Sequence, residues 1–424
     1  MKIPLMKFLD EYAGRLIAFA LAIFFGKRGN AGKKSPRKIL VTKFWGIGSV
    51  TLSIPLLVHL KKKYPECEIH YLTLESNLQL CRIIQEADVI HAVSTESLFS
   101  FFKTFTKAMS ALRREPIEVV FDLEFFTNVS AIVSALVGAP QRIGFVNRRH
   151  TFDVRKRLYT QQVEFCADKH TAENFLRLAG ADDAIQFSPF RLGEGRGEDS
   201  TFPKNKSSVL TPTSQSSPCW ERKEISPTVR GGLEWGKFSV LFNINASPLA
   251  YERRWEREEF RRLAEFLIEE FDVYLYLTGT DDERTYVQEF FQSLDCQENV
   301  MNCCGELSIQ GLVRLMRRCH LVVTNDSGPL HLASALNIPT IAFFGPETPQ
   351  RYGSLSDLHL TFYKNLWCSP CMTISNLKTV NCINDRQCMK QIRFAEIKEE
   401  IDSFVRSLPK IQNEIVEHSA AGEA

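Results

Sequence analysis

The chain has 424 residues, of which 44% are hydrophobic and 24% are charged. This length is enough for two domains of ordinary size, and the composition is typical of a globular protein. The formal net charge of +2 gives no general basis for nucleic-acid binding, so we expect no nucleic-acid partner.

The first predicted element is an apolar run near the N-terminus. Residues 16–25 (LIAFALAIFF) carry no charge, and residues 27–38 carry six Lys or Arg residues and no acid. A bilayer-spanning helix needs about 20 apolar residues, so this run is too short. Asp10 and Glu11 stand where a signal peptide carries positive charge. The pattern favours a helix in a membrane interface, with the basic residues against anionic lipid. The alternative is a helix packed on the protein's own core.

From residue 38 onward, short apolar runs alternate with helical patterns. This alternation predicts parallel β-sheets covered by helices on both faces. A segment rich in Ser, Pro and Gly interrupts it, and the alternation restarts at FSVLFNI. The fold class is therefore α/β, with two doubly wound domains that we expect to face each other across a cleft. The expected parts are a membrane-interface helix with a basic linker (1–37), an N-terminal Rossmann-like domain (38–190), a linker or disordered insertion (191–237), a C-terminal Rossmann-like domain (238–408) and a tail (409–424).

Polar residues follow the predicted strand HLVVTN directly. Asp326, Ser327 and Gly328 stand at its carboxyl end, and Pro329 opens the next helix. A helix N-terminus offers unpaired N–H groups and partial positive charge, so it can cradle a diphosphate. His331 on the same helix can donate to a phosphate or sugar oxygen. The alternative is simple helix capping by Asp326 or Ser327.

Four of the twelve cysteines lie within a short stretch near the end of the chain. Their spacing is C-x2-C-x10-C-x5-C, formed by Cys368, Cys371, Cys382 and Cys388. Four thiolates could bind a structural zinc ion tetrahedrally. The alternative is a reduced or disulfide-bonded loop.

These motifs together resemble the signature of glycosyltransferase family 9, the bacterial heptosyltransferase family. The C-terminal part has the order strand, Asp-Ser-Gly-x-x-His, helix, Pro339, strand and Phe-Gly-Pro-x-x-Pro (344–349). The N-terminal part contains the opening strand and a glycine loop with Gly46, Gly48 and Ser49. The segment ERRWEREEF resembles a further family element. The resemblance covers most of residues 38–400 outside the linker.

The resemblance implies two Rossmann-like domains of the GT-B type. It also implies inverting transfer of a sugar from a nucleotide-diphosphate donor, such as ADP-heptose, with no cofactor required for catalysis. The implied donor-binding residues are Asp326, Ser327, Gly328 and His331. Arg253 matches a basic residue that neutralises the charge of the leaving group. By analogy with other dinucleotide folds, we expect Asp282 to bind the ribose, with Asp281 and Glu283 as alternatives. Ordinary helix N-capping is the alternative role for these three acids.

One position departs from the family pattern. The family's first glycine loop usually reads Gly-Asp, and that aspartate is the expected general base, whereas this chain reads Gly48-Ser49. A serine hydroxyl is a poor base at neutral pH. The best substitutes are Glu124 and then Asp122, which lie in the segment VVFDLEFF at the exit of a predicted strand. The alternative for Glu124 is a structural role, as a cap or as the partner of a nearby basic residue.

These features predict a glycosyltransferase attached peripherally to the inner membrane at its cytoplasmic face. The expected acceptor is a lipid-linked glycan such as lipopolysaccharide core. One alternative is a sugar-nucleotide epimerase of GT-B architecture. Another is a catalytically silent protein of glycan assembly that binds a nucleotide sugar.

Overall fold

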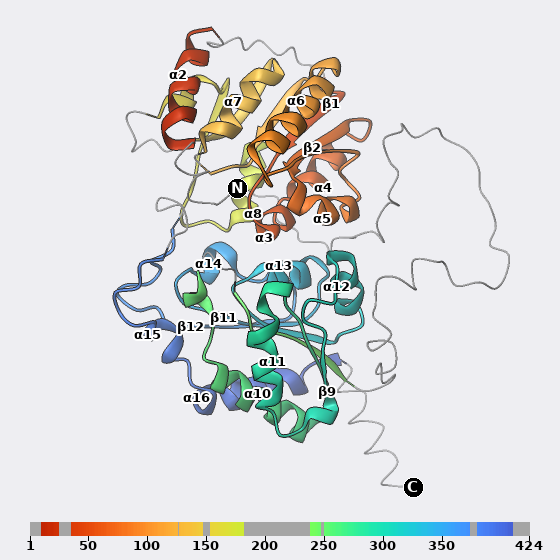
Figure 1. Ribbon diagram of the computed structural model, residues 1–424, viewed down its shortest axis with the longest axis vertical. Helices are drawn as coiled ribbons and strands as arrows, with labels where there is room; N and C mark the ends of the chain where they lie inside the picture. The colour runs from red at the N-terminus through yellow and green to blue at the C-terminus, as the bar shows by residue number, and fades with distance from the viewer. Residues whose placement is uncertain are drawn as a thin grey trace, which may run out of the picture. The chain divides into compact units, whose positions relative to one another are not determined.

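The computed structural model describes residues 10–24, 35–125, 127–146, 153–181, 238–246, 250–373 and 380–409 (Figure 1). The chain divides into two compact units, residues 1–193 and 194–424. Each unit contains one six-stranded parallel sheet, which confirms the predicted α/β class. The predicted linker at 191–237 lies outside the described residues, and the interdomain cleft stays a prediction.

The N-terminal unit has strand order β3-β2-β1-β4-β5-β6. The strands are β1 (Lys38–Thr42), β2 (Glu68–Leu74), β3 (Val89–Val93), β4 (Val119–Asp122), β5 (Gln141–Val146) and β6 (Gln161–Glu164). The α-helices are α2 (Arg15–Phe24), α3 (Ile47–Thr51), α4 (Ile54–Lys63), α5 (Leu78–Ile83), α6 (Leu98–Arg114), α7 (Asn128–Val137) and α8 (Thr171–Leu178). Short turns of helix are η1 (Asp10–Gly14), η2 (Glu75–Asn77) and η3 (Val154–Arg157).

The central strands of this sheet are apolar because helices cover both of their faces. In β1 every residue after Lys38 is buried, and β4 is buried throughout. The chain order reverses between β1 and β4, which pair in parallel. The carboxyl ends of these two strands therefore flank the topological switch point, where ligands bind in open α/β sheets.

Two helices follow the glycine loop, where the run SVTLSIPLLVHLKKKYP predicts a single helix. α3 ends at Thr51, and α4 begins at Ile54 with Pro55 in its first turn. Proline has no N–H, so Pro55 cannot donate to the carbonyl of Thr51, and the first helix does not continue into the second. The amide of Leu57 then donates to the carbonyl of Ser53 at 3.2 Å and starts the second helix.

The C-terminal unit repeats the same topology, with strand order β12-β11-β10-β7-β8-β9. The strands are β7 (Ser239–Asn243), β8 (Tyr274–Leu277), β9 (Val300–Asn302), β10 (Leu321–Asn325), β11 (Thr340–Phe344) and β12 (His359–Tyr363). The α-helices are α10 (Arg257–Phe271), α11 (Arg284–Gln292), α12 (Ile309–Met316), α13 (Gly328–Ala335), α14 (Pro349–Tyr352), α15 (Gln387–Lys390) and α16 (Phe394–Arg406). Short 3-10 turns are η5 (Tyr251–Arg253), η6 (Asp281–Glu283) and η7 (Gln297–Asn299). The switch point of this sheet lies between β7 and β10.

The N-terminal helix α2 packs partly on its own unit. It contacts α7 and η3 and buries Ala18. Leu16, Ile17, Phe19 and Ile23 stay about half or more exposed, at 73%, 49%, 52% and 68%. Packing on the core therefore accounts for one side of the helix only. In the part of the chain that the structure describes, no helix has the length and apolarity needed to span a bilayer.

Candidate functional site

The exit of β10 forms the candidate donor site of the C-terminal unit. Ser327 is the N-cap residue of α13, yet its side chain makes no capping hydrogen bond. Its hydroxyl lies 3.0 Å from the hydroxyl of Thr324 and donates to Asn243 at the end of β7 over 3.5 Å. Ser327 thus connects the two strands of the switch point. Its side chain does not supply the cap that the simpler alternative required.

Arg253 reaches the same point from a distant part of the chain. Its Nη1 donates to the backbone carbonyl of Asp326 at 2.8 Å and to the Asp326 carboxylate at 3.4 Å. The side chains of Arg253 and Asp326 are 12% and 5% exposed. The arginine predicted to neutralise the leaving group is therefore in direct contact with Asp326, one of the predicted donor-binding residues, at the start of α13. A guanidinium beside a helix N-terminus is a suitable environment for a diphosphate.

The loop that carries Arg253 is fixed by its neighbour Trp255. The indole is fully buried, stacks on Phe343 with ring centroids 3.8 Å apart, and donates from Nε1 to the Ile392 carbonyl at 2.7 Å. The Trp255 amide donates to the side-chain oxygen of Asn325 at 2.9 Å. Asn325, the last residue of β10, donates in turn to the carbonyls of Ile244 and Asn245. These bonds hold the Arg253 loop against the exits of β7 and β10.

His331 lies one turn into α13 and is 5% exposed. Its ring meets Tyr352 of α14 edge-on, with centroids 6.2 Å apart. Arg351, next to Tyr352, pairs with Glu347 at 2.7 Å, and the Glu347 side chain is completely buried. This ion pair stabilises the segment after β11, and the Tyr352 ring places that segment beside the helix that carries His331.

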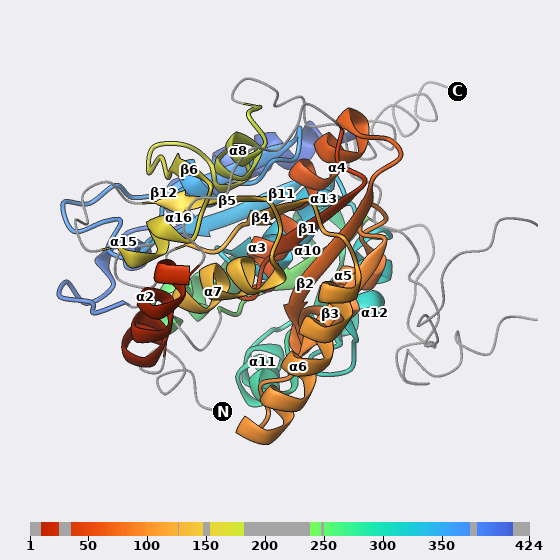
Figure 2. The same cartoon turned by 90° about the horizontal axis from the view of Figure 1, so that it is seen from above.

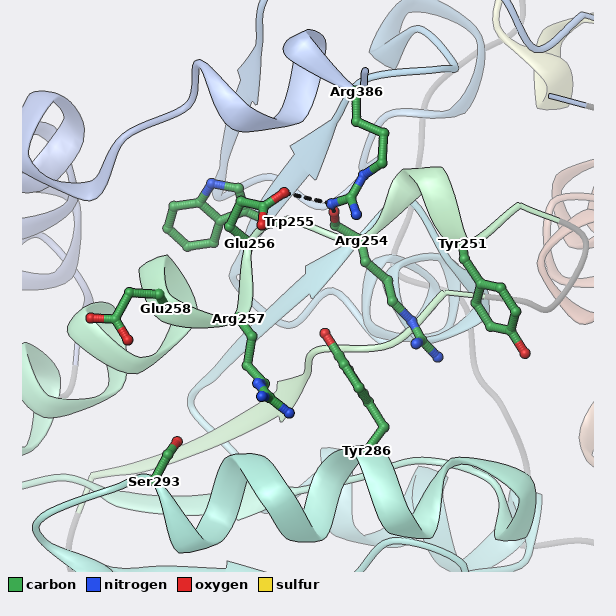
Figure 3. Close-up of a pocket in the computed structure, with 9 residues that line it drawn as sticks. All are labelled: Tyr251, Arg254, Trp255, Glu256, Arg257, Glu258, Tyr286, Ser293 and Arg386. Atoms are coloured by element: carbon green, nitrogen blue, oxygen red, sulfur yellow. Dashed lines mark hydrogen bonds and ion pairs between the residues drawn. The ribbon is translucent and has the colours of Figure 1, made fainter. Parts of the chain in front are cut away.

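Arg254 points away from the switch point. Its guanidinium lies between the rings of Tyr251 and Tyr286, 4.4 Å and 4.1 Å from their centroids (Figure 3). These residues line a separate cavity of about 520 Å³ together with Arg257 and Arg386. Arg386 pairs with Glu256 at 2.7 Å. Consecutive arginines of the ERRW segment therefore have different environments, and only Arg253 contacts Asp326.

Asp282, the predicted ribose ligand, is exposed in η6. Its neighbour Asp281 binds Arg284 at 2.5 Å on the surface. Glu283 accepts from the Thr280 backbone at 2.9 Å in a capping box, and its carboxylate lies 3.8 Å from Arg254. The assignment of Asp282 to the ribose stays a prediction.

In the N-terminal unit, Glu124 lies just beyond the end of β4 and is 3% exposed. Its Oε1 accepts from Lys43 Nζ at 2.8 Å, from the Phe44 amide at 2.6 Å and from the Trp45 amide at 3.0 Å. Lys43 is also buried, so the two side chains form a buried ion pair. Glu124 therefore fixes the chain between β1 and the glycine loop. Among the described residues, every hydrogen bond to its carboxylate falls on Oε1.

Asp122, the second candidate base, is completely buried. It accepts from Thr42 at 3.0 Å and from the Tyr159 hydroxyl at 2.6 Å. Burial raises the pKa of Asp122 to about 6, and burial also raises the pKa of Tyr159 well above its usual value. With no exposed surface, the Asp122 carboxyl group is surrounded by protein, which favours a structural role for it.

The glycine loop leads from Trp45 into α3. Gly46 is the N-cap of α3 and has φ 83°, a conformation that favours glycine. Gly48 and Ser49 lie within α3 and are half-buried. The loop thus starts from the backbone held by Glu124 and turns at Gly46.

The four clustered cysteines line a smaller cavity of about 140 Å³ and are free thiols. The Arg386 amide donates to the Cys382 sulfur at 3.1 Å. No group of three or more His, Cys, Asp or Glu side chains in the described residues is placed so that it could hold a metal ion. The observed arrangement of thiols therefore does not fit the predicted zinc site.

Several residues that support these regions of the two units were not predicted from the sequence, chiefly Lys43, Asn325 and the Glu347–Arg351 pair. Lys43 and Asn325 lie at the strand exits beside the switch points. Their position at the end of an apolar run was the sequence signal that could have identified them. For Glu347 and Arg351 the sequence signal was their i,i+4 spacing, directly after Gly345 and Pro346.

The chain is similar to known proteins in sequence. The model of glycosyltransferase family 9 (heptosyltransferase) matches residues 106–380. Lipooligosaccharide heptosyltransferase 2 of Campylobacter jejuni is 28% identical over 181 residues, which cover 41% of this chain and 53% of that protein. The chain thus spans about half the length of the curated relatives it matches.

Two solved structures are similar in fold. A family 9 glycosyltransferase from Veillonella parvula has a TM-score of 0.66 and 17% identity, covering 88% of this chain and 99% of that one. The E. coli ADP-heptose lps heptosyltransferase II has a TM-score of 0.61 and 21% identity, covering 89% and 99%.

Proposed function

The chain belongs to glycosyltransferase family 9 (heptosyltransferase), and from this premise we propose that it transfers a sugar from a nucleotide-diphosphate donor to a lipid-linked glycan. The observation that carries the proposal is the contact between Arg253 and Asp326 at the N-terminus of α13. The described hydrogen bonds of Arg253 use Nε and Nη1. Nη2 is therefore the nitrogen with which Arg253 would bind the diphosphate as the glycosidic bond breaks.

ADP-heptose is the proposed donor, since the E. coli relative is described as an ADP-heptose lps heptosyltransferase. Lipopolysaccharide core is the proposed acceptor, because the curated relatives are lipooligosaccharide and lipopolysaccharide heptosyltransferases. In this mechanism Asp326, Ser327 and His331 position the diphosphate and the sugar. The reaction inverts the anomeric configuration and uses no metal ion.

Glu124 is the proposed general base. The acceptor hydroxyl loses its proton as its oxygen attacks the anomeric carbon of the donor, and the nucleoside diphosphate leaves. Lys43 and the amides of Phe44 and Trp45 hold Oε1, so Oε2 would accept this proton. Asp122 is the weaker candidate because its carboxyl group is enclosed by protein.

Peripheral attachment to the cytoplasmic face of the inner membrane would place the enzyme beside an acceptor confined to that surface. The exposed apolar side of α2 supports this part of the proposal. The basic residues at 27–38 would add electrostatic attraction to anionic lipid.

The decisive experiment incubates the protein with ADP-heptose and a heptose-deficient lipopolysaccharide core and measures both glycosylated acceptor and released ADP. Acceptor-dependent formation of both products is expected. Release of nucleotide without acceptor would favour the epimerase alternative. Thermal stabilisation by ADP-heptose without any turnover would favour a catalytically silent binding protein.

A further inference from the structure

A second helix of the N-terminal unit, α6, exposes large apolar side chains. Leu98, Phe99 and Phe102 are 51%, 79% and 61% exposed. The inner side of α6 already packs on the core through Ala108, Met109 and Leu112. Phe99 and Phe102 therefore contribute little to the core of the unit.

The start of α6 is rigidly defined. Ser97 and Ser100 form a reciprocal capping box, with the Ser100 amide donating to the Ser97 hydroxyl at 3.1 Å. Phe101 and Phe105, which are half-buried, stack on each other with centroids 5.6 Å apart and pack against the core. The exposed phenylalanines thus project from a helix whose position is fixed by a cap and by packing.

The charges of α6 all have one sign. The helix contains Lys103, Lys107, Arg113 and Arg114 and no acidic residue. Lys103 and Lys107 are exposed and follow the phenylalanines along the helix. An exposed apolar tip followed by lysines is typical of helices that bind the interface of an anionic membrane, where the lysine stems can extend toward the lipid head groups.

α6 lies in the same layer of helices as α2. Both helices contact α7, which lies between them against the sheet (Figure 2). The turn η1, which leads directly into α2, is fixed to α7 by Asp10, whose carboxylate accepts from the amides of Asn128 and Val129 at 3.0 Å and 2.7 Å. Two sequence-distant helices with exposed apolar side chains are therefore held on either side of one helix.

We propose that the exposed side of α6, formed by Leu98, Phe99, Phe102, Lys103 and Lys107, is a membrane contact that acts together with α2 on an anionic lipid surface. This inference rests on the membrane attachment in the proposed function and extends it to a second, internal helix. Its positive charge complements anionic head groups, and its phenylalanines enter the boundary between head groups and acyl chains. Two contacts from one rigid unit would fix the orientation of that unit on the membrane, which a single N-terminal helix would not do.

The test measures binding of the full-length protein to sedimentable vesicles. One set of vesicles contains phosphatidylglycerol and phosphatidylcholine, and a second set contains phosphatidylcholine alone. The variant Phe99→Ser/Phe102→Ser removes the apolar tip, and Lys103→Glu/Lys107→Glu reverses the charge. Leu358→Ser, an exposed apolar position in the C-terminal unit, is the matched control. Thermal melting checks that each variant is folded, which is expected because the altered side chains are exposed.

The phenylalanine variant should bind the anionic vesicles about tenfold more weakly for each side chain lost, because each loses most of the transfer free energy of one aromatic group. The charge variant should bind the anionic vesicles more weakly than the unaltered protein does, and Leu358→Ser should bind them normally. If the unaltered protein binds the anionic vesicles and the phenylalanine variant binds equally well, α6 is not a contact, although attachment through α2 stands. If the unaltered protein binds neither set of vesicles, membrane attachment itself is wrong. Self-association in solution that the same substitutions abolish would instead identify a second copy of the chain as the partner.

Discussion

Replacing Arg253 by alanine tests the donor site most directly. The guanidinium contacts Asp326 and is largely shielded from solvent, at 12% exposure, so water screens its charge poorly. A hydrogen bond to a charged group contributes about 1.5–3 kcal/mol. At about 1.4 kcal/mol for each factor of ten, its loss should weaken ADP binding by roughly 10- to 150-fold.

The assay is calorimetric titration of ADP into the folded protein, with Arg254→Ala as the matched control. Arg254 is the adjacent arginine, but it stacks on Tyr251 and Tyr286 and makes no described contact with Asp326. Arg254→Ala should lower the melting temperature through lost packing and leave ADP affinity nearly unchanged. Arg253→Lys should give an intermediate affinity, because lysine restores the charge without the planar fork.

The reasoning is refuted if Arg253→Ala binds ADP as tightly as the unaltered protein does. It is also refuted if Arg254→Ala causes the larger loss of affinity while remaining folded. The second outcome would move the diphosphate to the cavity between the two tyrosines.

Three further predictions concern the base, the buried acid and metal ions. Glu124→Gln should lower turnover about 10²–10⁴-fold with little effect on ADP affinity, and it should destabilise the fold by leaving Lys43 buried without its carboxylate. The double variant Lys43→Met/Glu124→Gln should recover stability but not turnover. Full activity in either variant would show that Glu124 is not the general base. Asp122 has its folded pKa raised from 3.8 to about 6, so its stabilising contribution is present below the unfolded pKa and is lost as the pH rises through about 6. As the pH rises from 3.8 to about 6, the unaltered protein should therefore lose about 3 kcal/mol of unfolding free energy relative to Asp122→Asn, as measured by urea denaturation. If the unfolding free energies of the two proteins change in parallel with pH, the shifted pKa is contradicted. Dialysis against a metal chelator should leave the transfer rate unchanged, whereas a loss of activity restored by zinc would contradict metal independence.

The sequence predicted the central strands well because parallel strands buried on both faces appear as short apolar runs. Two edge strands, β6 and β12, were missed for the same reason. In β6 the residues Gln161, Gln162 and Glu164 are exposed, so no apolar run marks the strand. The first residue of β12, His359, is exposed as well, and only Phe362 of that strand is buried.

The candidate donor site could be predicted in part from strand exits, which gave Asp326, Ser327 and Gly328. The contact between Arg253 and Asp326 joins residues 73 positions apart, and no local spacing encodes it. It depends on Trp255 and Asn325, which hold the intervening loop through packing and a backbone hydrogen bond. Likewise, the role of Glu124 depends on Lys43, which is 81 residues away and is adjacent only because β1 and β4 pair.

The bond from Asp10 to the start of α7 has a consequence for how the N-terminus can be altered. α7 begins only a few residues after Glu124, and the side chain of its own N-cap residue, Thr127, makes no capping hydrogen bond. The cap is supplied instead by Asp10, 118 residues earlier in the chain. A protein shortened past Asp10 would leave the first amides of α7 without this acceptor, and the segment carrying the proposed base would lose its support. Reduced activity after such a truncation could then result from a displaced Glu124 as well as from lost membrane attachment. Substitutions on the exposed side of α2, which leave Asp10 in place, would separate membrane attachment from the support of α7.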